Sequence, residues 1–312
     1  MAQGHQHERG QRRARWQDPL DPHYQPYVDG YGPPVPPAWV KLVKPFWQDY
    51  ALQPEYDVRR LQADFETHAA AIAERQKRIN LLRKGGPRSQ ELGEYLAAFN
   101  GEIAPVTCCP ATVRQFRIWA VSEVLRIFSG FDDVRLLTLF FPEEDVPFGS
   151  LHTVDWARID MRVRRQIERA LSPYTLVVGS KEVDADYQSR TWRVHMHLLA
   201  ANCSEAERAN WRRRHFRPRS GRDGLMQVDA VQDLARQIAY AFKLIAFRRP
   251  FKQVGPSRSK GKRLRTEEHN EFVEYLASHK PTEFMFVFNA DRRNGKYFKI
   301  SRRVLDNLIV AL

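Results

Sequence analysis

Cysteine is scarce in this sequence, and no apolar run is long enough to cross a membrane. Three of the 312 residues are cysteines, and two of them, Cys108 and Cys109, are adjacent. Three cysteines form no disulfide framework, and adjacent cysteines lack the spacing of a zinc-binding pair. A membrane-spanning helix needs about 20 apolar residues in a row, and the first residues, MAQGHQHERGQRRARWQ, are too polar for a secretory signal. These absences predict a cytoplasmic protein with buried thiols and without a membrane partner.

Acidic residues are few relative to basic ones. The chain has 50 lysines and arginines against 37 aspartates and glutamates, which gives a net charge of +13 and an isoelectric point near 9.8. This surplus indicates a polyanionic partner, with nucleic acid as the first choice and an anionic membrane surface as the second. Hydrophobic residues make up 43% of the chain, which is enough for a sizeable core. The length fits one large domain with additions, or two smaller domains.

Prolines and glycines divide the chain into parts. The first part ends in DGYGPPVPP, which no helix crosses, so we expect a disordered or extended arm there. A long helical pattern follows and ends at Gly85 and Gly86. We predict an arm over 1–37, a helical segment over 38–105, a core domain over 106–250, and a basic loop with a C-terminal helix and hairpin over 251–312.

Apolar runs rich in strand formers alternate with amphipathic helical patterns in the core domain. Their order is strand, helix, strand, strand, helix, strand, helix. PYTLVVGSKEVDA and WRVHMHLLA, joined by DYQSRT, predict a hairpin inside this order. We therefore predict an α+β fold with a central antiparallel sheet, helices packed on one side of it, and an N-terminal helical segment. Near the C-terminus, Asn294-Gly295 predicts the turn of another hairpin.

Two histidines lie on the second strand of the core hairpin, in TWRVHMHLLAAN. His195 and His197 are two residues apart, so both side chains point to one face of the strand. Such a pair suits a metal ion, but it also suits two half-buried imidazoles that are merely hydrogen-bonded. In an antiparallel pair, the numbers of opposite residues have a constant sum. If that sum is odd, Glu182 on the preceding strand faces the same way as the two histidines. A turn centred on Tyr187 and Gln188, or on Gln188 and Ser189, gives such a sum. Two imidazoles and a carboxylate fit Mg²⁺ or Mn²⁺ bound to a phosphate, and also Zn²⁺.

The helical pattern LARQIAYAFKLIAF places a tyrosine and a lysine on one face. Tyr240, Lys243, Arg236 and Phe247 lie opposite an apolar stripe. The stripe consists of Leu234, Ile238, Ala241, Phe242 and Ile245. A tyrosine hydroxyl titrates near 10, so it is a weak nucleophile at neutral pH unless a nearby cation or metal favours the phenolate.

Three motifs in a fixed order make this sequence resemble the HUH endonuclease superfamily, in particular its rolling-circle replication-initiator (Rep) branch. The first is an apolar strand with a central threonine, here RLLTLFF around Thr138. The second is HMHLLA, and the third is Tyr-x-x-Lys on a helix, here YAFK. A glutamate often stands on the strand before the second motif, as Glu182 does. Two departures are Trp192 and Arg193 before the first histidine, where relatives often have Gly or Pro, and FFPEE after the first motif, where a second threonine is missing.

The resemblance implies a ferredoxin-like or RRM-like HUH core with Mg²⁺ or Mn²⁺ held by His195, His197 and Glu182. It also implies that Tyr240, next to Lys243, attacks a phosphodiester of single-stranded DNA at an origin hairpin. The products are a 5′-phosphotyrosine link and a free 3′-hydroxyl, which primes a polymerase and brings in host replication proteins. Histidines before a single tyrosine resemble Rep proteins and single-strand transposases, whereas conjugative relaxases have the tyrosine first.

Two basic runs flank the predicted tyrosine helix. Residues 208–222 contain seven arginines and no acid, and residues 248–265 contain eight lysines or arginines and no acid. Charge runs are usually just solvated, but the interleaved rings of Trp211, His215 and Phe216 in the first run favour a track that binds phosphates and stacks bases of single-stranded DNA. We predict DNA contacts at Arg212, Arg213, Arg214, Arg217, Arg236, Arg248 and Arg249.

Two other functions fit the same residues. One is a single-strand transposase of the same superfamily, and the other is a non-catalytic nucleic-acid-binding protein in which the motifs are a coincidence or a remnant. Genomic context distinguishes them, because an origin-like hairpin on a plasmid or phage favours replication and insertion-element ends favour transposition.

Overall fold

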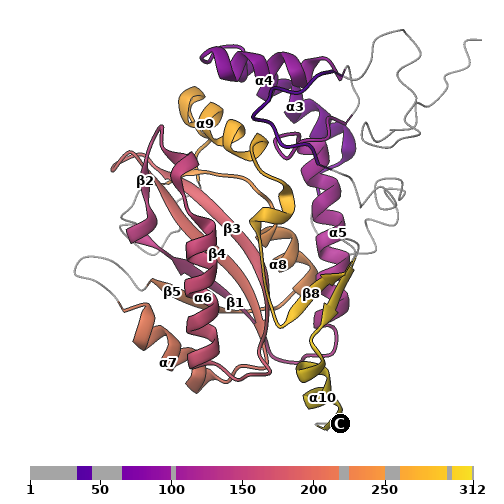
Figure 1. The fold of residues 1–312 in the computed structure, drawn as a ribbon, viewed down its shortest axis with the longest axis vertical. Coiled ribbons are helices and arrows are strands. Elements are labelled where there is room, and N and C mark those ends of the chain that lie inside the picture. Colours follow the sequence, from indigo (N-terminus) through magenta and orange to yellow (C-terminus); the bar gives the residue numbers. More distant parts are fainter. Residues whose placement is uncertain are drawn as a thin grey trace, which may run out of the picture.

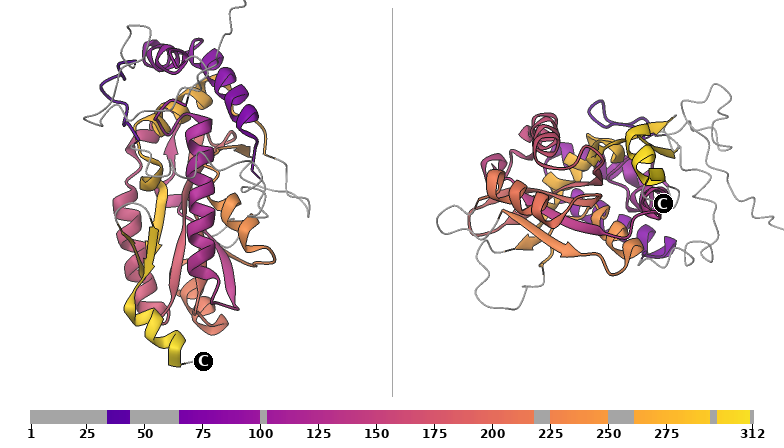
Figure 2. Two further views of the ribbon diagram at one scale, coloured as in Figure 1. Left: turned by 90° about the vertical axis from the view of Figure 1, so that its right-hand side faces the viewer. Right: turned by 90° about the horizontal axis from the view of Figure 1, so that it is seen from below.

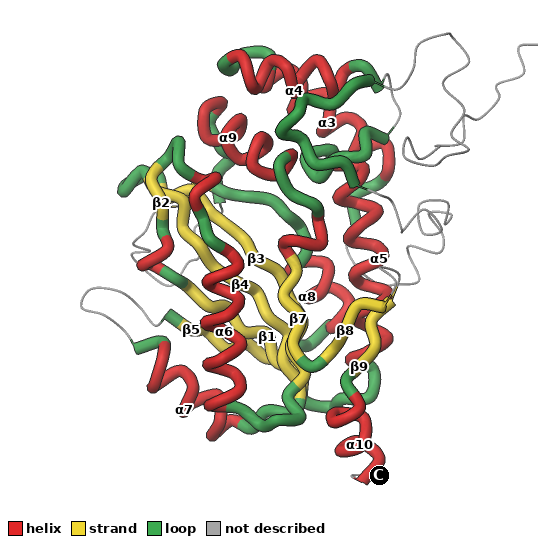
Figure 3. Tube along the Cα trace, viewed as in Figure 1, coloured by secondary structure: helices red, strands yellow, loops and turns green. Residues whose placement is uncertain are grey.

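The computed structural model describes residues 34–43, 65–99, 103–217, 225–249, 261–293 and 297–310 (Figure 1). The predicted arm therefore lies outside the described residues, apart from 34–37. The described part is an α+β fold in which eight α-helices surround a seven-stranded sheet (Figure 3). This confirms the predicted fold class, which is α+β with a central antiparallel sheet, helices packed on the sheet, and a helical segment before it in the sequence.

The sheet has the strand order β5-β1-β4-β3-β6, with β2 paired to β4 and β7 paired to β3. The strands are β1 Val134–Phe140, β2 Val146–Pro147, β3 Leu176–Asp186, β4 Thr191–Ala201, β5 Met226–Ala230, β6 Arg248–Arg249 and β7 Met285–Phe288. All pairs are antiparallel except β3 with β6, which is parallel. The long strands β3 and β4 lie next to each other inside the sheet, so side chains at their middle are sheltered from its edges.

The β3–β4 hairpin has the register that brings the predicted ligands together. Glu182 stands directly opposite His195, which corresponds to a turn centred on Gln188 and Ser189. Asp186 stabilises this turn, because its Oδ1 accepts hydrogen bonds from the backbone N–H groups of Gln188 at 2.9 Å and Ser189 at 3.4 Å.

Helices cover both faces of the sheet, and not one side as predicted. Lys181 points away from its neighbour Glu182, and its ammonium pairs with Asp160 at 2.6 Å on the far face. The far face carries α6 Trp156–Ala170 and α7 Glu205–His215, and the face of Glu182 carries α5 Pro110–Phe128 and α8 Leu234–Ala241 (Figure 2). Almost every residue of β3 and β4 is buried, so apolar side chains on both faces need a covering layer.

The remaining elements pack at the ends of the sheet. Figure 1 shows α3, α4 and α9 gathered at one end of the molecule. Their bounds, with the last three elements, are α3 His68–Leu82, α4 Pro87–Ala97, α9 Thr266–Ala277, β8 Ala290–Arg293, β9 Tyr297–Ile300 and α10 Arg302–Val310. The predicted C-terminal hairpin is β8–β9, and its turn residues 294–296 lie outside the described ones. The stretch before it, β7, joins the main sheet beside β3.

One continuous cluster of buried side chains runs from Val40 to Phe298. The N-terminal helices and the C-terminal hairpin therefore pack on the same core as the sheet, and the division into four parts stays a prediction. All three cysteines are buried free thiols, as expected. Among the described residues, no helix combines the length and apolar character that a membrane span requires.

The helix of the tyrosine motif, α8, is shorter than its sequence pattern predicts. It ends at Ala241, and Leu244 adopts a left-handed conformation with φ 47°. Ile245 is therefore 40% exposed and not part of the apolar stripe, and Phe247 lies beyond the helix. The cause lies on β3, where Asp184 accepts a hydrogen bond from the N–H of Phe247 at 2.9 Å and the following residues pair as β6. Strand pairing replaces the helical hydrogen bonds that this pattern would otherwise form.

Candidate metal and nucleophile site

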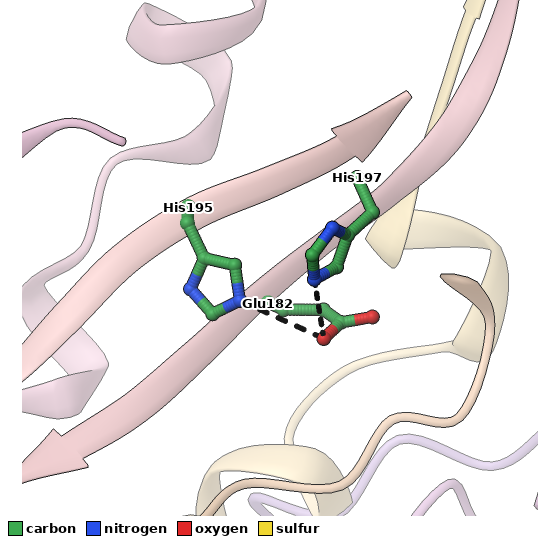
Figure 4. Close-up of side chains that lie close together, drawn as sticks. All are labelled: Glu182, His195 and His197. Carbon is green, nitrogen blue, oxygen red and sulfur yellow. Dashed lines mark ion pairs between the residues drawn. The ribbon is translucent and has the colours of Figure 1, made fainter. Parts of the chain in front are cut away.

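Two histidines and a glutamate converge on the α8 face of the sheet (Figure 4). The Nε2 atoms of His195 and His197 lie 3.7 and 3.6 Å from Oε2 of Glu182, and the three donor atoms lie within 4.8 Å of one another. Ligand atoms that are each about 2.1 Å from one ion are about 3.0–3.6 Å apart at angles of 90° to 120°. The cluster could therefore hold a metal ion after small side-chain rotations.

Nδ1 of each imidazole, the ring nitrogen that does not face Glu182, has a hydrogen-bond partner. Nδ1 of His197 lies 3.0 Å from Oγ1 of Thr138, and Nδ1 of His195 lies 3.4 Å from the carbonyl oxygen of Arg193. Both contacts leave Nε2 turned toward Glu182. Metal-binding histidines are commonly oriented by such a partner on their second nitrogen.

Ser180 connects the cluster to the helix of the tyrosine motif. Its hydroxyl lies 3.0 Å from Oε1 of Glu182 and also contacts the carbonyl oxygen of Ala241, the last residue of α8. The helix is thereby fixed to β3 at its C-terminal end. Tyr240 precedes Ala241, and its ring centroid lies 5.4 Å from that of His197. The tyrosine stays 38% exposed, so a ligand can reach its side chain.

The close approach of β3 and β4 beside His197 depends on Gly179. A Cβ at this position would lie 2.0 Å from the carbonyl oxygen of His197 and 2.7 Å from Cα of Leu198. We expect Gly179→Ala to lower the free energy of unfolding by about 1–3 kcal/mol and to displace His197, because the neighbouring backbone has to shift. Urea unfolding and Mn²⁺ titration measure the two effects. Gly130→Ala is the control, since its added Cβ meets nothing within 4 Å. Equal stability and equal Mn²⁺ affinity of the two variants would show that the backbone contact at Gly179 does not matter.

Burial sets the protonation of the metal-free cluster. It lowers the pKa of His197 to about 4. Burial also lowers the pKa of His195, but the contact with Glu182 and the charge of Asp184 outweigh it, so the net shift is upward. Burial raises the pKa of Glu182, but the two histidines outweigh that effect and leave it below its ordinary value. At neutral pH His197 is neutral and Glu182 is ionised, so of the three groups His195 keeps its proton to the highest pH, and that proton competes with a metal.

This protonation pattern predicts how metal affinity depends on pH. Because the pKa of His195 lies above 6.5 in the metal-free protein, we expect Mn²⁺ affinity to rise about tenfold per pH unit below that pKa and to level off above it. Calorimetry in buffers of different ionisation enthalpy measures the release of one proton. His195→Gln is the matched variant, which should bind more weakly and with a flatter profile. A wild-type affinity that falls as pH rises from 6 to 8 would show that the histidines are not ligands.

The tyrosine hydroxyl is protonated in the metal-free protein. Burial and the charge of Glu182 raise the pKa of Tyr240, and Arg249 lowers it by less. Nζ of Lys243 lies 4.9 Å from the centre of the tyrosine ring, over the ring face. Since α8 has already ended, the pair is joined by a turn in which the N–H of Lys243 donates to the carbonyl of Tyr240 at 3.4 Å. The predicted pairing of these two side chains is therefore present, but through a turn and not along a helix face.

The arginines of the first basic run lie far from the cluster. Arg212, Arg213, Arg214 and Arg217 are exposed on and after α7, which covers the opposite face of the sheet. Two of the three interleaved rings are buried and pack together: Trp211 contacts Phe216, and Phe216 contacts Phe141. The prediction that Trp211 and Phe216 stack on bases is wrong, because their apolar surface belongs to the core, whereas His215 is exposed.

The other three predicted arginines have different surroundings. Arg236 is exposed in the first turn of α8. Arg248 pairs with Glu268 of α9 at 2.9 Å and is directed away from the cluster. Arg249 lies on the cluster's face, with Nε 3.0 Å from Oδ2 of Asp184. The structure thus places one arginine of this pair at the site.

Sequence reasoning missed three side chains around the site. Thr138 was singled out only as the centre of the first motif, yet its hydroxyl lies 3.0 Å from Nδ1 of His197 and orients that ring. Ser180 and Asp184 went unnoticed, although each is two residues from Glu182 and so shares its face. The alternation of side chains along the strand, applied two residues before and two residues after Glu182, would have identified Ser180 and Asp184.

Comparisons with protein-family models, with curated proteins and with solved structures found no match to this chain.

Proposed function

We propose that this protein is a replication initiator that nicks single-stranded origin DNA by tyrosine transesterification, as the resemblance to Rep-type HUH endonucleases implies. The observation that carries the proposal is the position of Tyr240, half-exposed and 5.4 Å between ring centroids from His197 of the His-His-Glu cluster. A nuclease that uses metal-bound water needs no tyrosine there, and a binding module needs neither feature. The net charge of +13 suits a DNA substrate.

The donor set of two imidazoles and one carboxylate fits Mg²⁺ or Mn²⁺, which when bound would act as a Lewis acid toward a phosphate oxygen. The residues of the chain supply the nucleophile. The hydroxyl of Tyr240 loses its proton to water, its oxygen forms a bond to phosphorus, and the bond from phosphorus to the 3′ oxygen breaks. That oxygen takes up a proton and becomes the free 3′-hydroxyl. The phosphotyrosine link keeps the energy of the phosphodiester, so the ends can be rejoined by the reverse step.

The test is incubation of the protein with Mn²⁺ and a pool of single-stranded stem-loop oligonucleotides labelled at the 3′ end. A 5′-phosphotyrosine link leaves the label on the protein, so we expect a labelled band that survives a denaturing gel and that disappears with EDTA. Cleavage without a labelled protein would indicate a metal-water nuclease. Binding without cleavage would indicate a non-catalytic nucleic-acid-binding protein.

The position of α7 changes the expected path of the DNA. A short single strand at Tyr240 does not reach the far face of the sheet, so we expect reversal of charge at Arg212, Arg213 and Arg214 to leave the salt dependence of its binding unchanged. Arg236→Ala on α8 should reduce the log–log slope by roughly 0.7, the loss of one phosphate contact. Fluorescence anisotropy between 50 and 300 mM salt measures both slopes. A flatter slope for the α7 variant would restore the path predicted from the sequence.

A further inference from the structure

Arg249 is directed into the site by its place in the sheet. The two-residue strand β6 runs parallel to β3 and places Arg249 opposite Asp186 and Arg248 opposite Ala185. Paired residues share a face and neighbours alternate, so Arg249 lies on the face of Glu182. Arg248 lies on the other face, where Glu268 pairs with it. Strand pairing thus separates two adjacent arginines into one at the site and one in a structural ion pair.

A fixed carboxylate holds the guanidinium of Arg249. Its Nε lies 3.0 Å from Oδ2 of Asp184. The other oxygen of Asp184 accepts a hydrogen bond from the backbone N–H of Phe247 at 2.9 Å, so rotation of the carboxylate would break this hydrogen bond as well as the ion pair. The side chain of Asp184 is 13% exposed and that of Arg249 is 30% exposed. The cation is therefore held in place on one side and open to a ligand on the other.

Two cations lie beside the group that would react. Burial and the charge of Glu182 raise the pKa of Tyr240, and the nearby positive charge of Arg249 opposes them. Lys243, the lysine of the Tyr-x-x-Lys motif, lies over the ring face of the same tyrosine, with Nζ 4.9 Å from the ring centre. Arg249 comes from the sheet, where Asp184 pairs with it. The sheet thus supplies a cation beside the tyrosine in addition to the lysine of the motif.

We propose that Arg249 is a catalytic residue that binds the oxygen of Tyr240 and the adjacent phosphate through its N–H groups, and that Asp184 positions it. This inference rests on the proposed nicking reaction. In that reaction the phenolic proton passes to water, the P–O bond to Tyr240 forms, the P–O3′ bond breaks, and the 3′ oxygen takes up a proton. Arg249 keeps all of its protons, since a guanidinium does not titrate in proteins. It stabilises negative charge on the tyrosine oxygen in both directions of the reaction.

The test compares single-turnover rates of adduct formation at saturating DNA. We expect Arg249→Ala to slow the reaction roughly 100-fold, as loss of one charge-stabilising donor does, and Arg249→Lys to recover part of that loss. Added guanidinium at millimolar concentration should partly restore Arg249→Ala. Asp184→Asn should slow the reaction about tenfold. The variant that combines Asp184→Asn with Arg249→Ala should be no slower than Arg249→Ala alone, because Asp184 acts only by positioning Arg249. Arg165→Ala, which removes an exposed arginine from α6 on the far face, is the matched control.

Two further measurements separate catalysis from damage to the fold. Mn²⁺ affinity and the free energy of unfolding of Arg249→Ala and Arg249→Lys should stay close to those of the control. Adduct formation by Arg249→Ala at the rate of Arg165→Ala would overturn the inference and leave the proposed function standing. Effects of the Asp184 and Arg249 variants that simply add would overturn the positioning role of Asp184. Absence of an adduct from the unaltered protein would overturn the proposed function, and this inference with it.

Discussion

We expect Tyr240→Phe to abolish nicking and the covalent adduct together. The substitution removes one oxygen, which in the proposed reaction attacks phosphorus and leaves again when the strand is rejoined. Loss of a covalent nucleophile lowers rates by at least about 10⁴-fold. The ring is retained, so its contact with His197 remains. Because the side chain is 38% exposed, the free energy of unfolding should change by less than about 0.5 kcal/mol.

A matched control exists at Tyr174, whose side chain is also 38% exposed. Tyr174→Phe should nick at the rate of the unaltered protein. DNA binding of both variants, measured with Ca²⁺ in place of Mn²⁺, should be equal. If Tyr240→Phe still cuts DNA at a comparable rate, water and not the tyrosine is the nucleophile.

The second large effect concerns the two histidines. We expect His195→Gln combined with His197→Gln to lower Mn²⁺ affinity by at least about 100-fold and to abolish cleavage, because two of three protein ligands are lost. Alanine is the less suitable replacement, since both imidazoles are buried, at 4% and 8% exposure. Removing two buried rings would leave a cavity and cost stability as well as ligands.

Calorimetry and urea unfolding separate these contributions. The glutamine variant should unfold cooperatively with stability near that of the unaltered metal-free protein, and without Mn²⁺ protection. Thr138→Val serves as a graded comparison, because it removes the hydroxyl beside Nδ1 of His197 and leaves all three ligands. A loss of about 10-fold in affinity is expected there. Equal Mn²⁺ affinity of the unaltered protein and the glutamine variant would show that the cluster is not a metal site.

Local patterns in the sequence were sufficient for the sheet and for the three clustered residues. The spacing of His195 and His197 fixes their common face, and the short hairpin fixes the register that adds Glu182. Ser204 and Glu207 have the three-residue spacing of a capping box, and this box is present at the start of α7. These features depend on residues close to one another in the chain, where propensity and periodicity act directly.

Features set by partners distant in the sequence were not predictable in this way. α8 ends early because Phe247 finds Asp184, more than 60 residues away. Trp211 is of a residue type that often stacks on bases, but it is buried because it packs on Phe216, which in turn packs on Phe141 in the core. In the same way, nothing in the run RRPFK distinguishes Arg248 from Arg249 until β6 pairs with β3. Periodicity cannot anticipate contacts of this kind, because the competing partners lie on other elements.

The most direct measurement is the identity of the residue that carries the DNA. After reaction with Mn²⁺ and a labelled single strand, the adduct is digested with protease and nuclease and the modified peptide is sequenced by mass spectrometry. The account predicts a phosphonucleotide on Tyr240, within the peptide that contains QIAYAFK, and none in the presence of EDTA. DNA attached to Tyr174, Tyr187 or Tyr275, or cleavage with no modified peptide at all, would contradict it.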